Sequence, residues 1–197
     1  MGKSTLLWLL AVATLTGCMI PGTYYDPFDN YVIGLRSYDR GAYQQAAERW
    51  EPLVKAGDCD AQFRYGMLYF RGVGIRDERD SGYAEPNYAK ALELWNLAAN
   101  QGQPKTQIVL GDLYYQGQKV TIRCTMADCG IQRNLVTAYK WYLLGEKSAY
   151  YAGEKEYLSR ILLSIRVEMT QLEREEGENM VAKWKPSPSA CKPRRLL

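Results

Sequence analysis

The sequence predicts an all-α fold in which about four antiparallel helix pairs stack into a solenoid. The first observation is a repeat, since Gln62, Gly66, Tyr69 and Gly72 recur 45 residues later as Gln107, Gly111, Tyr114 and Gly117. The second is that Asn87, Ala91 and Trp95 recur 47 residues later as Asn134, Ala138 and Tyr142. The third is that Ala46, Trp50 and Gly57 stand 45 residues before Ala91, Trp95 and Gly102. A period of this length is typical of a solenoid, in which each unit buries its apolar face only against its neighbours.

The recurring glycines predict close helix packing. Gly66 and Gly111 fall in the middle of expected helices, where glycine costs about 1 kcal/mol relative to alanine. Such a cost is acceptable if the missing side chain lets a partner helix approach. We expect Ala91 and Ala138 to be the small residues that face these glycines, while the tyrosine three residues after each glycine fills the space between neighbouring helices.

The expected helices follow in chain order from this repeat. The predicted pairs are 28–39 with 42–56, 59–71 with 87–101, 105–116 with 134–147, and 154–167 with 171–184. Asn87 is a favourable N-cap, and Thr170 with Glu173 forms a capping-box pattern at the start of the last helix. The domain is therefore expected to span 28–184. A basic, proline-containing tail follows at 185–197.

Four segments of these units resemble the Sel-one-like repeat (SLR) family, relatives of the tetratricopeptide repeat. They are AQFRYGMLYFRGVGI at 61–75, KALELWNLAANQG at 90–102, TQIVLGDLYYQG at 106–117 and TAYKWYLLG at 137–145. The resemblance covers about 31–148 and implies a right-handed α-solenoid that acts as an adaptor or scaffold. The chain departs from the family at Tyr65, where a leucine is usual, and in two long loops at 73–86 and 118–133.

Residues 1–17 have the features of an export signal. Lys3 precedes a largely apolar run that is too short to span a bilayer as a helix. The run ends in Leu15-Thr16-Gly17-Cys18, which resembles the bacterial lipobox and implies that Cys18 becomes the acylated first residue of the mature chain. Met19 implies the outer membrane in that family's sorting rule, with the domain on the periplasmic face. The alternative is a chance cysteine near the end of an ordinary signal peptide. Residues 18–27 are expected to form a short tether.

Composition excludes several kinds of active site. The chain has 197 residues, enough for one domain with a real core, and it contains no histidine. Ser-His-Asp and Cys-His catalysis and all imidazole metal sites are therefore excluded. Without the expected signal, 24 basic residues face 22 acidic ones, because Lys3 is lost from the 25. This near balance gives no reason to expect nucleic acid as a partner.

Four cysteines remain after Cys18, namely Cys59, Cys124, Cys129 and Cys191. An exported chain meets an oxidising compartment, so disulfides are favoured over a zinc site, whose CxxC spacing is also missing. Three pairings are possible. We expect Cys124 to pair with Cys129 in their shared loop. We expect Cys59 to pair with Cys191, because residues 185–191 can span about 23–25 Å when extended.

Partner-binding residues are expected where the repeat does not dictate the residue type. Arg64, Met67 and Arg71 lie at i, i+3 and i+7 on one helix face, and two of their equivalents in the next unit are Asp112 and Gln116. The two insertions carry further charged and aromatic candidates: Asp77, Arg79 and Tyr83 in the first and Arg123 in the second. Long loops in compact helical proteins tend to be functional. The alternative for the stripe is an ordinary solvated face.

These observations predict a non-enzymatic, protein-binding lipoprotein of the bacterial envelope, with no cofactor and no metal. Some SLR lipoproteins of Gram-negative envelopes resemble immunity proteins that neutralise type VI secretion phospholipase effectors. This chain is similar to them in size, anchor and repeat content, so a secreted phospholipase is one expected partner. The alternative is a periplasmic enzyme related to cysteine-rich helical-repeat proteins linked to penicillin binding or β-lactam hydrolysis. The regular paired cysteines of those relatives are missing here.

Overall fold

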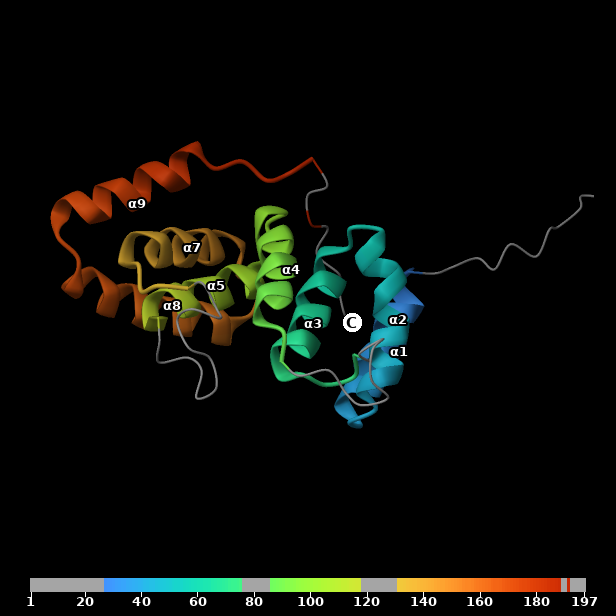
Figure 1. The fold of residues 1–197 in the computed structure, drawn as a ribbon. Coiled ribbons are helices and arrows are strands. Elements are labelled where there is room, and N and C mark those ends of the chain that lie inside the picture. The colour runs from blue at the N-terminus through green and yellow to red at the C-terminus, as the bar shows by residue number, and fades with distance from the viewer. Residues whose placement is uncertain (1–26, 76–85, 118–130, 189–190, 192–197) are drawn as a thin grey trace, which may run out of the picture.

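The computed structural model describes residues 27–75, 86–117, 131–188 and 191. Within these ranges the chain forms helices and no strands, so the all-α prediction is confirmed (Figure 1). The helices are α1 (Pro27–Asp39), α2 (Tyr43–Lys55), α3 (Cys59–Arg71), α4 (Tyr88–Asn100), α5 (Pro104–Gln116), α7 (Leu135–Ser148), α8 (Ala152–Glu168) and α9 (Gln171–Lys183). None of them is long and apolar enough to cross a membrane.

The helices stack as the predicted solenoid. α1 packs on α2, α3 on α4 and α5 on α7, and successive pairs are joined by contacts of α2 with α3 and of α4 with α5. Three apolar clusters follow this order, one for each pair with its neighbours. Trp50, Trp95, Tyr139 and Tyr142 are the largest fully buried side chains. The core is therefore divided among the repeats, as expected for a solenoid.

The last two helices depart from the predicted pairing. α8 packs on α7 through Leu158, Leu162 and Ile165, but α9 also packs on α7 rather than mainly on α8. The reason lies in the narrow apolar face of α9, where Gly177 lies against Tyr139 and Val181 joins the cluster that contains Trp141. α9 therefore runs back along the stack (Figure 1). α8 and α9 therefore do not form the fourth helix pair that the sequence predicted.

The repeat glycines face aromatic rings, not the alanines that the sequence suggested. A Cβ atom at Gly34 or Gly66 would lie 2.2 Å or 2.4 Å from an indole nitrogen, and one at Gly111 would lie 2.5 Å from a tyrosine ring carbon. The rings belong to Trp50, Trp95 and Tyr142, in the same order. Ala91 and Ala138 are fully buried, but the aromatic residue four positions later occupies the space above each glycine. Glycine is required there because a side chain and the ring cannot share that space.

The two tryptophans also fix the position of each helix along the axis of its partner. Trp50 donates its indole N–H to the carbonyl of Tyr31 at 3.2 Å, and Trp95 donates to the carbonyl of Phe63 at 3.1 Å. Both acceptors lie three residues before the glycine of the same unit. A buried indole N–H is thus satisfied by backbone, and Gly34 is identified as the glycine of the first unit. It precedes Gly66 by 32 residues, a spacing that differs from the 45-residue period of the later units.

Candidate protein-binding site

Part of the predicted site lies outside the described residues. This applies to Cys18, to Asp77, Arg79, Tyr83 and Arg123, and to the pairing of Cys124 with Cys129. Their roles stay predictions. The described candidates are Arg64, Met67 and Arg71 on α3 and Asp112 and Gln116 on α5.

Both ends of α3 are well defined. At its start the Asp58 side chain accepts a hydrogen bond from the backbone N–H of Ala61 at 2.8 Å. At its end Gly72 adopts a left-handed conformation with φ 65°, which favours glycine and closes the last turn. A helix fixed at both ends and packed on α2 and α4 presents its side chains in set positions.

The two arginines of α3 have no carboxylate partner among the described residues. Arg64 is partly buried, and its Nε atom is buried without a hydrogen-bond acceptor. Its guanidinium carbon lies 5.6 Å from the ring centre of Phe63. Arg71 is exposed, and its guanidinium carbon lies 5.7 Å from the ring centre of Tyr38 on α1. Contacts of this kind orient a guanidinium while leaving its donors available to a ligand.

Met67 lies between the two arginines and is partly buried against the cluster that contains Phe63 and Trp95. Seven residues of helix place Arg64 and Arg71 about 10 Å apart along the axis. The stripe is therefore a pair of positive groups on either side of a flexible apolar side chain. We refer to Arg64, Met67 and Arg71 as the α3 stripe.

Asp112 contacts two tyrosines of the neighbouring helices. Its Oδ1 accepts hydrogen bonds from the hydroxyl of Tyr142 on α7 at 2.7 Å and from the hydroxyl of Tyr157 on α8. Burial raises the pKa of the Asp112 carboxyl above its usual range, although the two tyrosine hydrogen bonds oppose this shift. Burial and the same carboxylate raise the pKa of both phenols. The carboxylate thus joins α5, α7 and α8.

Gln116 is exposed at the end of α5, beside a polar cluster. Tyr115 donates its hydroxyl to Glu168 of α8, and this hydrogen bond is the main cause of the raised pKa of Tyr115. Arg133 forms an ion pair with Glu168 and donates from Nε to the carbonyl of Tyr115 at 3.0 Å. The end of the second insertion is therefore attached to both α5 and α8.

The two insertions close on the same backbone position of their units. The N–H of Asn87 donates to the carbonyl of Tyr69, and the N–H of Asn134 donates to the carbonyl of Tyr114, each at 2.8 Å. The first unit, which has no insertion, makes the equivalent bond from Ala42 to Ser37 at 2.8 Å. Each insertion thus begins and ends at an equivalent helical turn of its unit.

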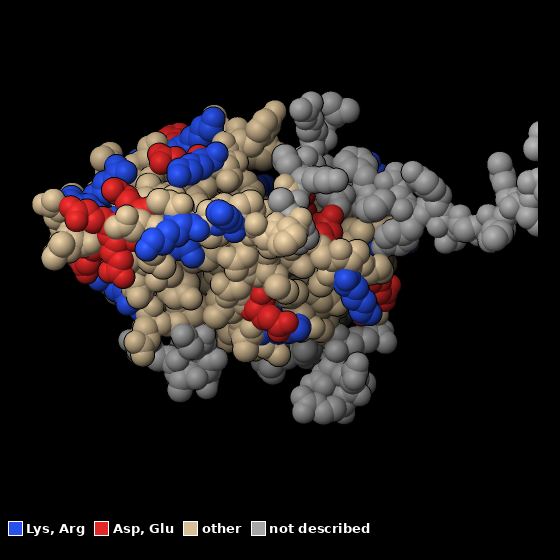
Figure 2. Space-filling view, turned by 90° about the horizontal axis from the view of Figure 1, so that it is seen from above, with Lys and Arg blue, Asp and Glu red and all other residues tan. Residues whose placement is uncertain are grey.

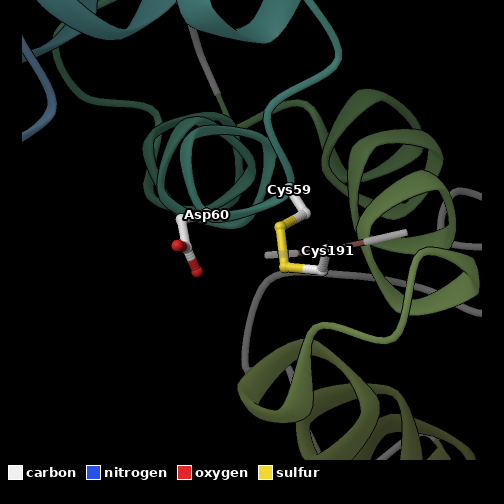
Figure 3. A group of neighbouring side chains, drawn as sticks. All are labelled: Cys59, Asp60 and Cys191. Atoms are coloured by element: carbon white, nitrogen blue, oxygen red, sulfur yellow. A yellow bond between two sulfur atoms is a disulfide. The ribbon is translucent and has the colours of Figure 1, made fainter. Parts of the chain in front are cut away.

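The predicted pairing of Cys59 with Cys191 is confirmed (Figure 3). The chain after α9 reaches Cys59 along the end of α4, where the N–H of Ser187 donates to the carbonyl of Asn100 and that of Cys191 to the carbonyl of Gln101, both at 2.8 Å. Ser187 and Cys191 of the basic tail are therefore held against the end of α4. Asp60 lies beside the two sulfur atoms, with ligand atoms within 4.8 Å of one another. Because the sulfurs are bonded to each other, they are not thiolate ligands for a metal.

The surface charge does not form one large field on the face that carries α9. Figure 2 shows Lys and Arg interspersed with Asp and Glu among the coloured residues of this face. A continuous basic surface, which nucleic-acid binding requires, is not present among them.

The fold is similar to a solved structure of the SLR class. The neighbour is a protective antigen present in uropathogenic Escherichia coli strains and displays an SLR fold. The match has a TM-score of 0.64 at 19% sequence identity and covers 84% of this chain. This chain spans only 32% of the length of that antigen. The sequence matches no protein-family model and no curated protein.

The comparison shows the fold class of the protein, a helical-repeat fold of the SLR type. The SLR resemblance inferred from the repeat segments is therefore confirmed at the level of the fold.

Proposed function

We propose that the chain is a non-enzymatic, lipid-anchored scaffold of the bacterial envelope that binds another protein through the α3 stripe. The observation that carries this proposal is the state of Arg64 and Arg71, two cations on a fixed helix without a carboxylate partner among the described residues. Arginine and aromatic residues supply most of the energy of protein interfaces. A helical-repeat scaffold typically uses an extended surface of this kind to hold a partner.

The chemistry of the stripe defines the partner. Two arginines whose positions on α3 lie about 10 Å apart along the helix axis fit two acidic groups on one face of a partner segment. Met67 between them fits an apolar side chain, since methionine adapts to irregular surfaces. A secreted phospholipase effector with an acidic, apolar patch is the specific partner that the SLR resemblance favours.

Two features support an envelope location. The lipobox-like Leu15–Cys18 sequence implies acylation, and two or more acyl chains give stable membrane attachment. The disulfide between Cys59 and Cys191 is typical of an oxidising compartment. Cys18→Ala should release the chain into the soluble fraction after lysis, and flotation of this variant with outer membranes would contradict the anchor.

The binding site is tested by isolating the partner and then measuring its affinity. The lipidated chain is cross-linked in its own envelope, and the captured protein is identified by mass spectrometry. Arg71→Ala should then weaken binding about thirtyfold, which corresponds to about 2 kcal/mol for an interface anchor. Arg64→Ala should act in the same direction.

Arg49→Ala is the matched control, because Arg49 is an exposed arginine on α2 that donates to Asn30 away from the stripe. Its affinity should equal that of the wild type, and all three variants should keep the wild-type melting temperature. Full binding by Arg64→Ala/Arg71→Ala would place the site elsewhere. Turnover of a lipid, glycan or β-lactam by the purified chain would contradict a purely binding function.

A further inference from the structure

Three side chains that carry metal-binding atoms meet at the start of α3 (Figure 3). The sulfur atoms of Cys59 and Cys191 and a carboxylate oxygen of Asp60 all lie within 4.8 Å of one another. Cys59 is buried, whereas Asp60 and Cys191 are only half-buried, so solvent reaches the edge of the group. In the oxidised chain the disulfide occupies both sulfurs. Reduction frees two thiols beside a carboxylate, and thiolates and carboxylates are both zinc ligands in proteins.

Hydrogen bonds as well as the disulfide hold Cys191 beside Cys59. The backbone N–H of Cys191 donates to the carbonyl of Gln101 at 2.8 Å, and a second backbone bond of the same length joins the chain to α4 four residues earlier. The buried side chain of Gln101 in turn donates from Nε2 to Oε1 of Gln62 on α3 at 2.8 Å. Gln101 therefore links the segment that carries Cys191 to the helix that carries Cys59. Because these bonds do not involve sulfur, they keep the two sulfurs near each other after reduction.

The Asp60 carboxylate is oriented by a buried glutamine. Gln103 is 5% exposed and donates from Nε2 to Oδ1 of Asp60 at 3.2 Å. The other end of the same amide is also fixed, since Oε1 of Gln103 accepts from the backbone N–H of Thr106 at 2.6 Å. Carboxylates that bind a metal are typically held by a hydrogen bond of this kind from a second residue. The carboxylate is thus positioned in the way that a metal ligand requires.

We propose that the reduced chain binds one zinc-like divalent cation through Cys59, Asp60 and Cys191, with a fourth position open to water. Tetrahedral zinc holds its sulfur and oxygen ligands about 3.5–3.8 Å apart. The Cα atoms of the two cysteines are 5.7 Å apart, and the three ligand atoms already lie within 4.8 Å, so side-chain rotations suffice to form the site. This proposal does not depend on the α3 stripe. It goes beyond the prediction of no metal, which concerned the oxidised cysteines.

The step that opens the site is a thiol–disulfide exchange. A dithiol reductant supplies two electrons and becomes a disulfide, and its two protons pass to Cys59 and Cys191, which become thiols. The cation then displaces these protons, because only the thiolate is a ligand. A bound cation should in turn slow the return of the disulfide, since both sulfurs are occupied. The group therefore holds either a disulfide or a metal ion, according to its oxidation state.

The test is cobalt binding by the full chain, reduced and then freed of reductant under nitrogen. Co²⁺ replaces zinc as the probe, because thiolate ligation gives it a charge-transfer absorption and a tetrahedral site gives it intense visible bands. The reduced wild type should show both signals, and Zn²⁺ should abolish them by displacement. The oxidised wild type should show neither. Asp60→Asn should weaken cobalt binding by the reduced chain about tenfold or more, since even the loss of a residue that only orients a ligand costs about 10–100-fold.

The matched control is Cys124→Ser/Cys129→Ser, which removes two thiols outside the described residues. After reduction it should bind one equivalent of Co²⁺ with the same spectrum, and adding Cys191→Ser to it should abolish the charge-transfer absorption. All variants are compared in the reduced state, so the loss of the disulfide is common to them. Asp60→Asn keeps both cysteines and tests the site even if the triple variant unfolds. A reduced wild type without the cobalt signals would overturn the proposal, as would signals that survive Cys191→Ser or ignore Asp60→Asn.

Discussion

The inner helices α3 and α5 occupy equivalent places in successive repeats, yet their faces serve different purposes. On α3 the glycine faces Trp95, whose indole is satisfied by a backbone carbonyl. On α5 the glycine faces Tyr142, whose hydroxyl extends further and donates to Asp112. Met67 is the equivalent of Asp112 on α3 and makes no such bond.

The exchange of tryptophan for tyrosine explains this difference. Asp112 supplies the acceptor that the Tyr142 hydroxyl needs in a buried place, and it also accepts from Tyr157 of α8. The face of α5 is thereby used to attach the next helix, whereas the α3 stripe keeps its cations available. Equivalent positions in a repeat thus predict a common fold but not a common function.

The largest expected effect on stability concerns a disulfide bond that α3 has and α5 lacks. α3 begins at Cys59, whose disulfide to Cys191 closes a loop with a sequence separation of 132 residues. Cys59→Ser/Cys191→Ser should lower the free energy of unfolding by about 4 kcal/mol, because a long loop removes much entropy from the unfolded chain. Denaturant unfolding with and without reductant measures this loss of stability. Equal stability of the oxidised and reduced wild type would show that the disulfide does not constrain the fold.

The next effect on stability tests the contact of a glycine with an aromatic ring, which α3 and α5 share. Gly111→Leu should cost about 3 kcal/mol, since even its Cβ would overlap the Tyr142 ring. Gly66→Leu should cost a similar amount against Trp95. The control is Gly153→Ala on α8, where an added Cβ meets no atom within 4 Å. It should be neutral or slightly stabilising. A Gly111→Leu melting curve like that of the wild type would exclude the close contact.

The third effect tests what differs between α3 and α5. Asp112→Ala should cost about 2 kcal/mol, because it leaves the Tyr142 and Tyr157 hydroxyls without their acceptor. It should not weaken partner binding, in contrast to Arg71→Ala. Thermal unfolding and the partner affinity are measured on the same samples. Loss of binding without loss of stability in Asp112→Ala would show that Asp112 belongs to the binding site, and would contradict the different uses assigned to α3 and α5.

The smallest effect is a pH dependence. Because the pKa of Asp112 is raised in the folded protein, the folded state binds the proton more tightly than the unfolded state. The contribution of Asp112 to stability is therefore full below its unfolded pKa and is lost as the pH rises through its folded pKa. Asp112→Asn removes this dependence. The stability of the wild type relative to Asp112→Asn should rise modestly as the pH is lowered from about 7 to about 4, and an unchanged difference would show that the carboxyl is not desolvated.

The repeat spacing predicted most of the fold. Local signals placed the described helices, because caps such as Asn87 and Thr170 act within three or four residues of their own position. The pairing of Cys59 with Cys191 also followed from chain order and reach. The site was predicted less completely. The α3 stripe lies on one helix as expected, but the contact of Arg71 with Tyr38 depends on how α1 packs in the stack, which the sequence pattern did not predict.

By itself, then, the sequence determined the helices, their order and the glycine positions, because these depend on short-range propensity and on a period that can be counted. Only the tertiary structure decided that aromatic rings cover the glycines, that Asp112 is bound to two tyrosines and that α9 turns back onto α7. These features arise from contacts between residues that are distant in the chain and have no periodic relation. Such contacts depend on which side chains fill the same space, and this is set when the helices pack together.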